Sequence, residues 1–335
     1  MTPDASVVMS VYNGGSFLAQ AIESILGQSY SNFEFIIIDD GSSDGTTDAI
    51  GSYRDRRLRV IRHAQNAGLA VRLNQGIAVA SGRYVARMDA DDVSLPERLA
   101  RQVAFMQAHP HVGACGTWIE VAGEGIDQRW EYPASHRAIH ARLLFDCPMA
   151  HPTVMFDRLH LQKARLSYDS SYPCAQDYDL WCRAVRDLTL ANVPEVLLVR
   201  RLHGEQVGRR EANAQQRWAA RIRRRQLQQL GLEPSDGQAA VHEAISTWSW
   251  TPTEAFLQAA EDWLHRLRQA NRTADAYPEP EFSAVVGERW MAICRSVDPK
   301  LGRRFWNSPL SEALDLGWAE NLRGRAWRGL AMLGL

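Results

Sequence analysis

The sequence predicts an α/β protein with a doubly wound, mostly parallel sheet, followed by a helical C-terminal region. In the first half of the chain, short apolar runs alternate with amphipathic helical patterns, as in proteins built from βαβ units. Several of these runs end in polar clusters, and such sheets bind ligands at the carboxyl ends of their strands. After Gly208 the composition becomes helical, which predicts a second region.

The N-terminal part predicts four strands with helices between them. The run FEFIII is apolar on both faces, as in a parallel strand covered on both sides. Ser16 is a plausible N-cap for the first helix, and Asp44 can cap the helix after the second strand. We expect strands at 6–11, 33–38, 58–63 and 82–88, and helices at 16–28 and 69–80.

From Pro96 onward the alternation is less regular, so fewer elements can be predicted. We expect helices at 96–110, 176–187 and 211–232, and strands at 112–123, 151–156 and 196–203. The chain is divided accordingly into a first domain over 1–208, with parts 1–95 and 96–208, and a helical region over 209–335.

Composition excludes several classes of protein. The chain has 335 residues, of which 45% are hydrophobic and 23% charged, and its net charge is -1, so no overall field attracts nucleic acid. The five cysteines are scattered and form no CxxC pair, which favours a reducing compartment over disulfides or a zinc site. No signal peptide and no run of eighteen apolar residues is present, so we expect a cytoplasmic protein.

Three carboxylates follow the strand predicted at 82–88. Asp89, Asp91 and Asp92 lie within four positions, and like charges this close repel each other unless a cation compensates them. Clustered carboxylates suit a hard cation such as Mg²⁺ or Mn²⁺, which keeps positions open for phosphate oxygens. The alternative is an ordinary acidic loop, but its position at the end of a buried strand favours a metal site.

The order of motifs resembles a family 2 glycosyltransferase with a GT-A fold. The resemblance covers roughly residues 5 to 205 and rests on VVMSVYNGGSF, FEFIIIDDGSSDGT, GRYVARMDADD and QDYDLWCRA. It implies an inverting transfer of a sugar from a nucleotide-sugar donor to a hydroxyl group. It also implies that 1–95 is the nucleotide-binding part and 96–208 the acceptor-side part.

The resemblance places a nucleotide site on the loops after the first strands. Tyr12 could stack on the base, and Asp40 would accept a hydrogen bond from the imide N–H of uracil, because an ionised carboxylate only accepts. The alternative for Asp40, and more so for Asp39, is a role within the turn. The residues assigned to nucleotide binding are Ser10, Tyr12, Asn13, Asp40, Asn66, Arg72 and Asp89.

By the same resemblance, Asp91 ligates the metal and His203 lies near the metal or the diphosphate. Asp89 would bind the ribose, or the metal through water. Asp92 is assigned to the donor sugar or to capping of the following helix, and His203 could also be purely structural. The expected cofactor is Mn²⁺ or Mg²⁺.

Asp177 in QDYDLW is the general base that the resemblance implies. An inverting transfer needs one base to take the proton of the acceptor hydroxyl group. The alternative is that Asp177 only caps its helix. Asp179 lies on a different face of the same helix from Asp177, and it has no assigned role.

The basic helix predicted at 211–232 allows two interpretations. Arg217, Arg221, Arg224 and Arg225 recur beside Trp218, Ile222 and Leu227. Such a helix could associate with an anionic membrane surface at its inner, cytoplasmic face. The favoured alternative is a solvated helix packed on the catalytic domain.

The functional interpretation is transfer of a sugar, favoured to be UDP-linked, to a glycan or lipid-linked glycan in polysaccharide or surface-glycan biosynthesis. A sugar nucleotidyltransferase is the first alternative, but VYNGGSF lacks the basic residue that a triphosphate-binding loop would carry. A non-catalytic nucleotide-sugar binding module is the second alternative. The intact acidic triplet and Asp177 argue against it.

Overall fold

The computed structural model describes residues 2–204, 212–298 and 303–312, in two compact units. The first unit comprises Met1–His136 and Met149–Gln206, and the second comprises Arg137–Pro148 and Val207–Leu335. The predicted boundary between 208 and 209 lies outside the described residues. The sequence-based division places 137–148 with the first domain, whereas the contacts group it with the C-terminal helices.

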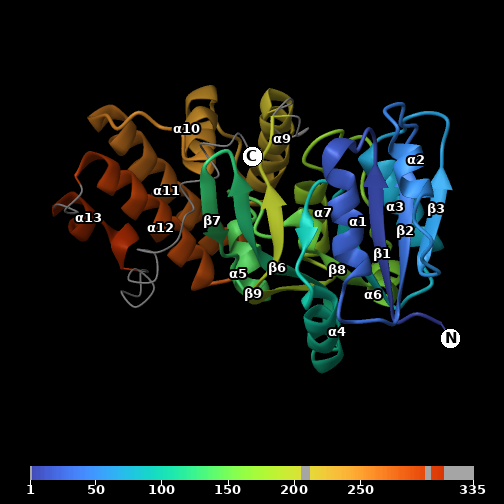
Figure 1. Ribbon diagram of the computed structural model, residues 1–335. Helices are drawn as coiled ribbons and strands as arrows, with labels where there is room; N and C mark the ends of the chain where they lie inside the picture. The colour runs from blue at the N-terminus through green and yellow to red at the C-terminus, as the bar shows by residue number, and fades with distance from the viewer. Residues whose placement is uncertain (1, 205–211, 299–302, 313–335) are drawn as a thin grey trace. The chain divides into compact units, whose positions relative to one another are not determined.

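The first unit is an α/β fold with one mixed sheet. Its N-terminal half is parallel, in the order β3-β2-β1-β4, and Figure 1 shows β1, β2 and β3 side by side. The strands are β1 (Ala5–Val11), β2 (Phe33–Asp39), β3 (Leu58–Arg62), β4 (Tyr84–Met88), β5 (Val93–Ser94), β6 (Val112–Gly123), β7 (Ile126–Trp130), β8 (Met155–Asp157) and β9 (Thr189–Arg201).

Beyond β4 the sheet continues as β8-β6-β9-β5, with β7 paired to β6. Here antiparallel pairs predominate, although β6 and β9 run parallel over a long irregular register. The helices of this unit are η1 (Gly15–Phe17), α1 (Leu18–Leu26), α2 (Thr46–Gly51), α3 (Leu69–Val79), α4 (Arg98–Ala108), η2 (His151–Thr153), α6 (Arg158–Ala164) and α7 (Gln176–Ala184).

Most predicted elements are found within a few residues of their expected bounds. The strand predicted at 196–203 begins earlier, at Thr189, and ends at Arg201. The strand predicted at 151–156 is shorter than expected, because 151–153 form a 3₁₀ turn and only Met155–Asp157 pair as β8. Pro152 has no N–H group to donate to a neighbouring strand, which explains why the strand does not begin at 151. The hairpin strand β7 was not predicted. In the structure a tight turn precedes it, in which Glu124 and Gly125 both have positive φ.

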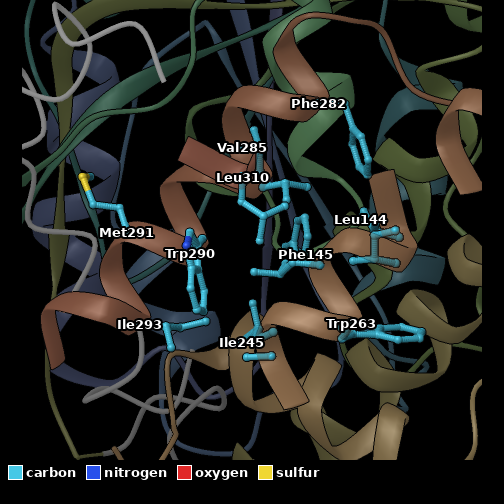
Figure 2. Packing of buried hydrophobic residues seen from close by; sticks show 14 of the residues in the cluster. Leu144, Phe145, Ile245, Trp263, Phe282, Val285, Trp290, Met291, Ile293 and Leu310 are labelled. Carbon is cyan, nitrogen blue, oxygen red and sulfur yellow. The ribbon is translucent and has the colours of Figure 1, made fainter. Parts of the chain in front are cut away.

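The second unit is helical. Its elements are α5 (His136–Arg142), α9 (Ala212–Gln229), α10 (Asp236–Thr247), α11 (Glu254–Ala274), α12 (Glu281–Val297), α13 (Arg303–Asn307) and η3 (Pro309–Ser311). Its core is rich in aromatic side chains, and Figure 2 shows Phe145, Trp290 and Leu310 among the buried residues of this cluster. No helix in the described part of the chain combines the length and apolarity needed to cross a bilayer.

A buried histidine sits in this second core. His242 is 1% exposed, donates from Nε2 to the carbonyl oxygen of Leu144 and accepts from the indole N–H of Trp263 at Nδ1. These two contacts fix the neutral tautomer. Burial lowers the pKa of His242 to about 3.

Candidate active site

The loops after β1 and β2 are held together by hydrogen bonds. The N–H of Asn13 donates to Ser42 Oγ at 2.9 Å, and the N–H of Ser43 donates to Asn13 Oδ1 at 2.9 Å. Asn13 has a φ of 51°, a conformation that asparagine tolerates well. Ser10, at the end of β1, is half-buried, and Tyr12 is 53% exposed, so its ring is available for stacking.

The two acids that end β2 have different surroundings. Asp39 Oδ1 accepts from the N–H of Ser42 at 3.0 Å and Oδ2 from Thr47 Oγ1 at 2.5 Å. Burial alone would raise the pKa of Asp39, but these hydrogen bonds bring it below its ordinary value. Asp39 therefore supports the turn.

Asp40 anchors the start of α3. Its carboxylate accepts from the N–H groups of Ala67 and Gly68, both at 2.9 Å, and from Arg72 Nε at 2.5 Å. Gly41 allows the close approach, since a Cβ atom there would lie 2.9 Å from the backbone of Gln65. A carboxylate has about four acceptor positions, so Asp40 keeps roughly one for a further donor.

Arg72 is buried and serves the same turn. Besides its ion pair with Asp40, it donates from Nη2 to the carbonyl oxygen of Gln65 at 2.9 Å. Asn66, one residue further, is exposed. The structure thus brings Asp40 and Arg72 into direct contact, and Asn66 lies on the loop between them.

The acidic triplet gathers at the end of β4. One carboxylate oxygen from each of Asp89, Asp91 and Asp92 lies within 4.8 Å of the others. Burial, and then repulsion from Asp91 and Asp89, raises the pKa of Asp92 well above its ordinary value. Burial also raises the pKa of Asp89, and Asp91 adds to this, while Arg87 opposes it. A divalent cation would relieve this repulsion, so the donor set fits Mn²⁺ or Mg²⁺.

The members of the triplet differ in exposure. The side chains of Asp89 and Asp91 are each 31% exposed, whereas Asp92 is 1% exposed and accepts from the N–H of Arg201 at 3.2 Å. Asp92 caps no helix, because β5 follows it and α4 begins only at Arg98. Its hydrogen bond instead joins the triplet to the end of β9.

His203 reaches the triplet from the residues after β9. Its Nε2 lies 3.1 Å from Asp91 Oδ2, and its ring centroid is 4.5 Å from that of Phe17. Its Nδ1 is buried and has no hydrogen-bond partner among the residues that the structure describes. Arg201, beside it, donates from Nη1 to the carbonyl oxygen of Asp91 at 3.1 Å.

Asp177 is the second residue of α7. The N-cap position is Ala175, with a φ of 57° and no side-chain cap. Burial raises the pKa of Asp177, and the N–H of Tyr178 and the positive charges of Arg87 and Arg200 oppose this shift. Asp179 is fully buried and pairs with Arg183 at 2.8 Å, which gives it a structural role.

Three polar residues near this site had no assigned role in the sequence. Arg87 is buried in β4 and pairs with Asp89, and His151 Nε2 lies 2.7 Å from Tyr168 Oη. A charged residue inside the apolar run YVARM was a readable signal for Arg87. Nothing in the local sequence links His151 to Tyr168, because their contact depends on the tertiary fold.

Solved structures share this architecture. S. aureus TarS 1-349 in complex with UDP-GlcNAc superimposes with a TM-score of 0.57 at 18% identity, covering 91% of each chain. The mannosyltransferase PcManGT from Pyrobaculum calidifontis, in complex with GDP-Man and Mn²⁺, gives 0.55 at 17% identity, covering 96% of this chain and 88% of that one. The fold is that of the GT-A glycosyltransferases, as expected.

Sequence comparison identifies the family. The family model described as glycosyl transferase family 2 matches residues 6–160. An uncharacterized glycosyltransferase of Haemophilus influenzae is 33% identical over 237 residues, which is 67% of this chain and 73% of that protein. The chain belongs to glycosyltransferase family 2.

Proposed function

We propose that the protein is a metal-dependent, inverting glycosyltransferase that uses a nucleotide-sugar donor, with UDP as the favoured nucleotide. The observation that carries this proposal is the convergence of Asp89, Asp91 and Asp92 within 4.8 Å. The TarS complex with UDP-GlcNAc and the PcManGT complex with GDP-Man and Mn²⁺ support a nucleotide sugar and a divalent metal.

Asp91 and His203 are the proposed metal-holding residues. Asp89 would bind the ribose, or the metal through a water molecule. Asp92 is proposed for the donor sugar; it is 1% exposed and accepts a hydrogen bond from the N–H of Arg201. When bound, Mn²⁺ or Mg²⁺ neutralises the charge of the diphosphate leaving group.

The nucleotide would lie along the loops after β1 and β2. Tyr12 is exposed enough to stack on the base, and Ser10 and Asn13 line the same loop. The remaining acceptor position of Asp40 suits the imide N–H of uracil. Asn66 and Arg72 complete this proposed set from the loop that Asp40 anchors.

Asp177 is the proposed general base. The acceptor oxygen attacks the anomeric carbon while its proton passes to the Asp177 carboxylate. The bond from the anomeric carbon to the diphosphate oxygen breaks, and the nucleoside diphosphate leaves with that electron pair. A single in-line displacement inverts the anomeric centre. The raised pKa of Asp177 favours proton uptake.

The proposed acceptor is a hydroxyl group of a glycan or lipid-linked glycan, in polysaccharide or surface-glycan biosynthesis. A lipid-linked acceptor would require contact with the inner face of a membrane. The exposed face of α9 carries Arg217, Arg221 and Arg224. Ile222 and Leu227 are buried, so they are not available for insertion, and the association would be electrostatic.

A donor screen tests the proposal. Thermal unfolding is recorded with each nucleotide sugar and Mn²⁺, and the best ligand should stabilise by about 2.7 kcal/mol at a hundredfold excess over its dissociation constant. NMR of the product made from that donor should then show the inverted anomer. A retained anomeric configuration would refute the single displacement, and equal stabilisation with EDTA would refute the metal requirement.

A further inference from the structure

Arg87 is a charged residue inside a buried strand. All five residues of β4 are buried, and Arg87 itself is 4% exposed. Placing a guanidinium group there costs free energy unless an opposite charge compensates it. The compensating group is Asp89, two positions further along and therefore on the same face of the extended chain.

Both terminal nitrogens of the Arg87 guanidinium contact the carboxylate of Asp89, one at each oxygen. Arg87 Nη1 donates to Asp89 Oδ2 at 2.5 Å, and Nη2 pairs with Oδ1. This is the two-point fork that a guanidinium forms with a carboxylate, and it fixes the plane of the carboxylate. Nε of Arg87 is buried and has no hydrogen-bond partner within the described ranges.

The backbone of Arg87 is held from two sides. Its N–H donates to the carbonyl oxygen of Val154 at 2.8 Å, and its carbonyl oxygen accepts from Nη2 of the fully buried Arg98 at 2.6 Å. Arg98 in turn donates to Gln102, whose amide reaches the carbonyl oxygen of Thr153. The guanidinium therefore projects from a rigid position.

The charge of Arg87 also reaches the far side of the site. Burial raises the pKa of Asp177, and the positive charge of Arg87 opposes this rise. The same charge acts to lower the pKa values of His151 and Tyr168. His151 and Tyr168 are hydrogen-bonded at 2.7 Å, and the backbone of Tyr168 is fixed by two hydrogen bonds with Asn74. One guanidinium thus lies among the metal-side and base-side groups.

We propose that Arg87 is a positioning residue: its two-point fork holds the Asp89 carboxylate in the orientation required for metal-dependent nucleotide binding. This inference rests on the proposed function and adds a residue to it. Because the fork occupies both oxygens of Asp89, it leaves Asp91 as the less constrained carboxylate for direct contact with the cation. Only arginine can form such a fork with Asp89, which explains why arginine rather than lysine occupies this position of the strand.

The test is calorimetric titration of UDP in the presence of Mn²⁺, with Arg87→Met and Arg87→Lys. Groups that orient metal ligands typically contribute 10- to 100-fold in affinity, so Arg87→Met should weaken Mn²⁺-dependent UDP binding by about that factor. Arg87→Lys keeps the charge but loses the fork, and should still weaken binding about tenfold. The matched control is Arg83→Met, which breaks the ion pair with Asp157 beside the same strand and should leave binding unchanged.

A double-mutant cycle with Asp89→Asn separates positioning from general stability. If Arg87 acts through Asp89, Arg87→Met should cause less than a twofold further loss in the Asp89→Asn background. Equal losses in both backgrounds, or wild-type affinity in Arg87→Lys, would overturn the inference. Should Arg87→Met fail to fold, as judged by circular dichroism, the cycle is run with Arg87→Lys.

The outcome also distinguishes this inference from the proposed function. If wild type binds UDP in a Mn²⁺-dependent manner and Asp89→Asn weakens it, the proposed site is supported whatever Arg87 does. If wild type shows no such binding to any nucleotide diphosphate, the proposed function fails, and the role of Arg87 fails with it.

Discussion

His203 Nε2 lies 3.1 Å from Asp91 Oδ2, a contact between residues 112 positions apart in the chain. It joins the segment after β9 to the loop after β4, so the two predicted metal-holding side chains lie close together. The contact depends on β5 pairing with β9, which brings the two loops together. The candidate metal site therefore draws its residues from both halves of the sheet.

Replacing Asp91 should weaken metal-dependent nucleotide binding without unfolding the protein. Asp91 is partly exposed, so Asp91→Asn removes one negative charge from a repelling cluster and leaves no cavity. Titration with UDP should show at least a tenfold lower affinity than wild type in the presence of Mn²⁺, and little difference in affinity in the presence of EDTA. Asp127→Asn, on the exposed edge of β7, is the control. Unchanged Mn²⁺-dependent affinity in Asp91→Asn would rule out its role.

Replacing Asp177 should affect turnover and spare donor binding. A positioned general base contributes about 10²- to 10⁴-fold, so Asp177→Asn should lower kcat within that range. The affinity for the nucleotide should change less than twofold. The control is Asp187→Asn, an exposed acid shortly after α7. A similar loss in donor affinity and in kcat would assign Asp177 to binding instead.

Asp40 should determine the preference for uracil over cytosine. Cytosine has an acceptor where uracil has its imide N–H, and a hydrogen bond to a charged group contributes about 1.5–3 kcal/mol. The ratio of UDP to CDP affinity should therefore be large in wild type and fall toward one in Asp40→Asn. Loss of the contacts with Arg72, Ala67 and Gly68 will lower the stability of the protein. That loss should weaken the binding of UDP and CDP equally. An unchanged ratio would show that Asp40 only anchors α3.

The second unit should lose stability in acid through His242. Its folded-state pKa of about 3 lies below the ordinary value of 6.5, so the unfolded chain binds more protons between these two values. The stabilising contribution is fully present above about pH 6.5 and decreases as pH falls toward 3. By linkage the loss over this range amounts to roughly 5 kcal/mol.

Chemical denaturation at a series of pH values measures this effect. His242→Gln removes the titrating group, so its free energy of unfolding should depend less on pH between 6 and 4. The comparison is His109→Gln, an exposed histidine of the first unit. Parallel pH profiles for wild type and His242→Gln would contradict the assignment.

The exposed arginines of α9 should bind anionic membranes weakly and in a salt-dependent manner. Each arginine near such a surface contributes about 1 kcal/mol, and salt screens the attraction. Flotation with vesicles containing phosphatidylserine should decrease when Arg217, Arg221 and Arg224 are changed together to Gln. Changing Arg57, Arg83 and Arg129 to Gln instead removes the same net charge elsewhere. If both triple variants float equally, the face of α9 is not the contact surface.

The N-terminal half of the sheet could be predicted because its signals are local. Apolar runs such as 33–38 and the turn residues after them fix each strand and its end without reference to the rest of the chain. The prediction of a site at these strand ends follows from the same rule, since parallel strands bring their carboxyl ends to one edge.

The remaining features depend on contacts between distant residues. The periodicity of 211–232 predicted α9, but only the fold shows that Ile222 and Leu227 are buried while Arg217 and Arg221 are exposed. The pairing of His151 with Tyr168 likewise crosses β8 and α6. Local patterns carry no information on such partners.

The segment 137–148 belongs to a core whose other residues are synthesised much later. Leu144 and Phe145 are fully buried against residues that lie between 227 and 310. At about 5–20 residues per second, a ribosome needs on the order of ten seconds to extend from this segment to α12. During that interval these apolar side chains have no permanent neighbours. Translation therefore passes through a stage in which these apolar side chains lack the core that buries them, and ending the chain at residue 206 would make that stage permanent.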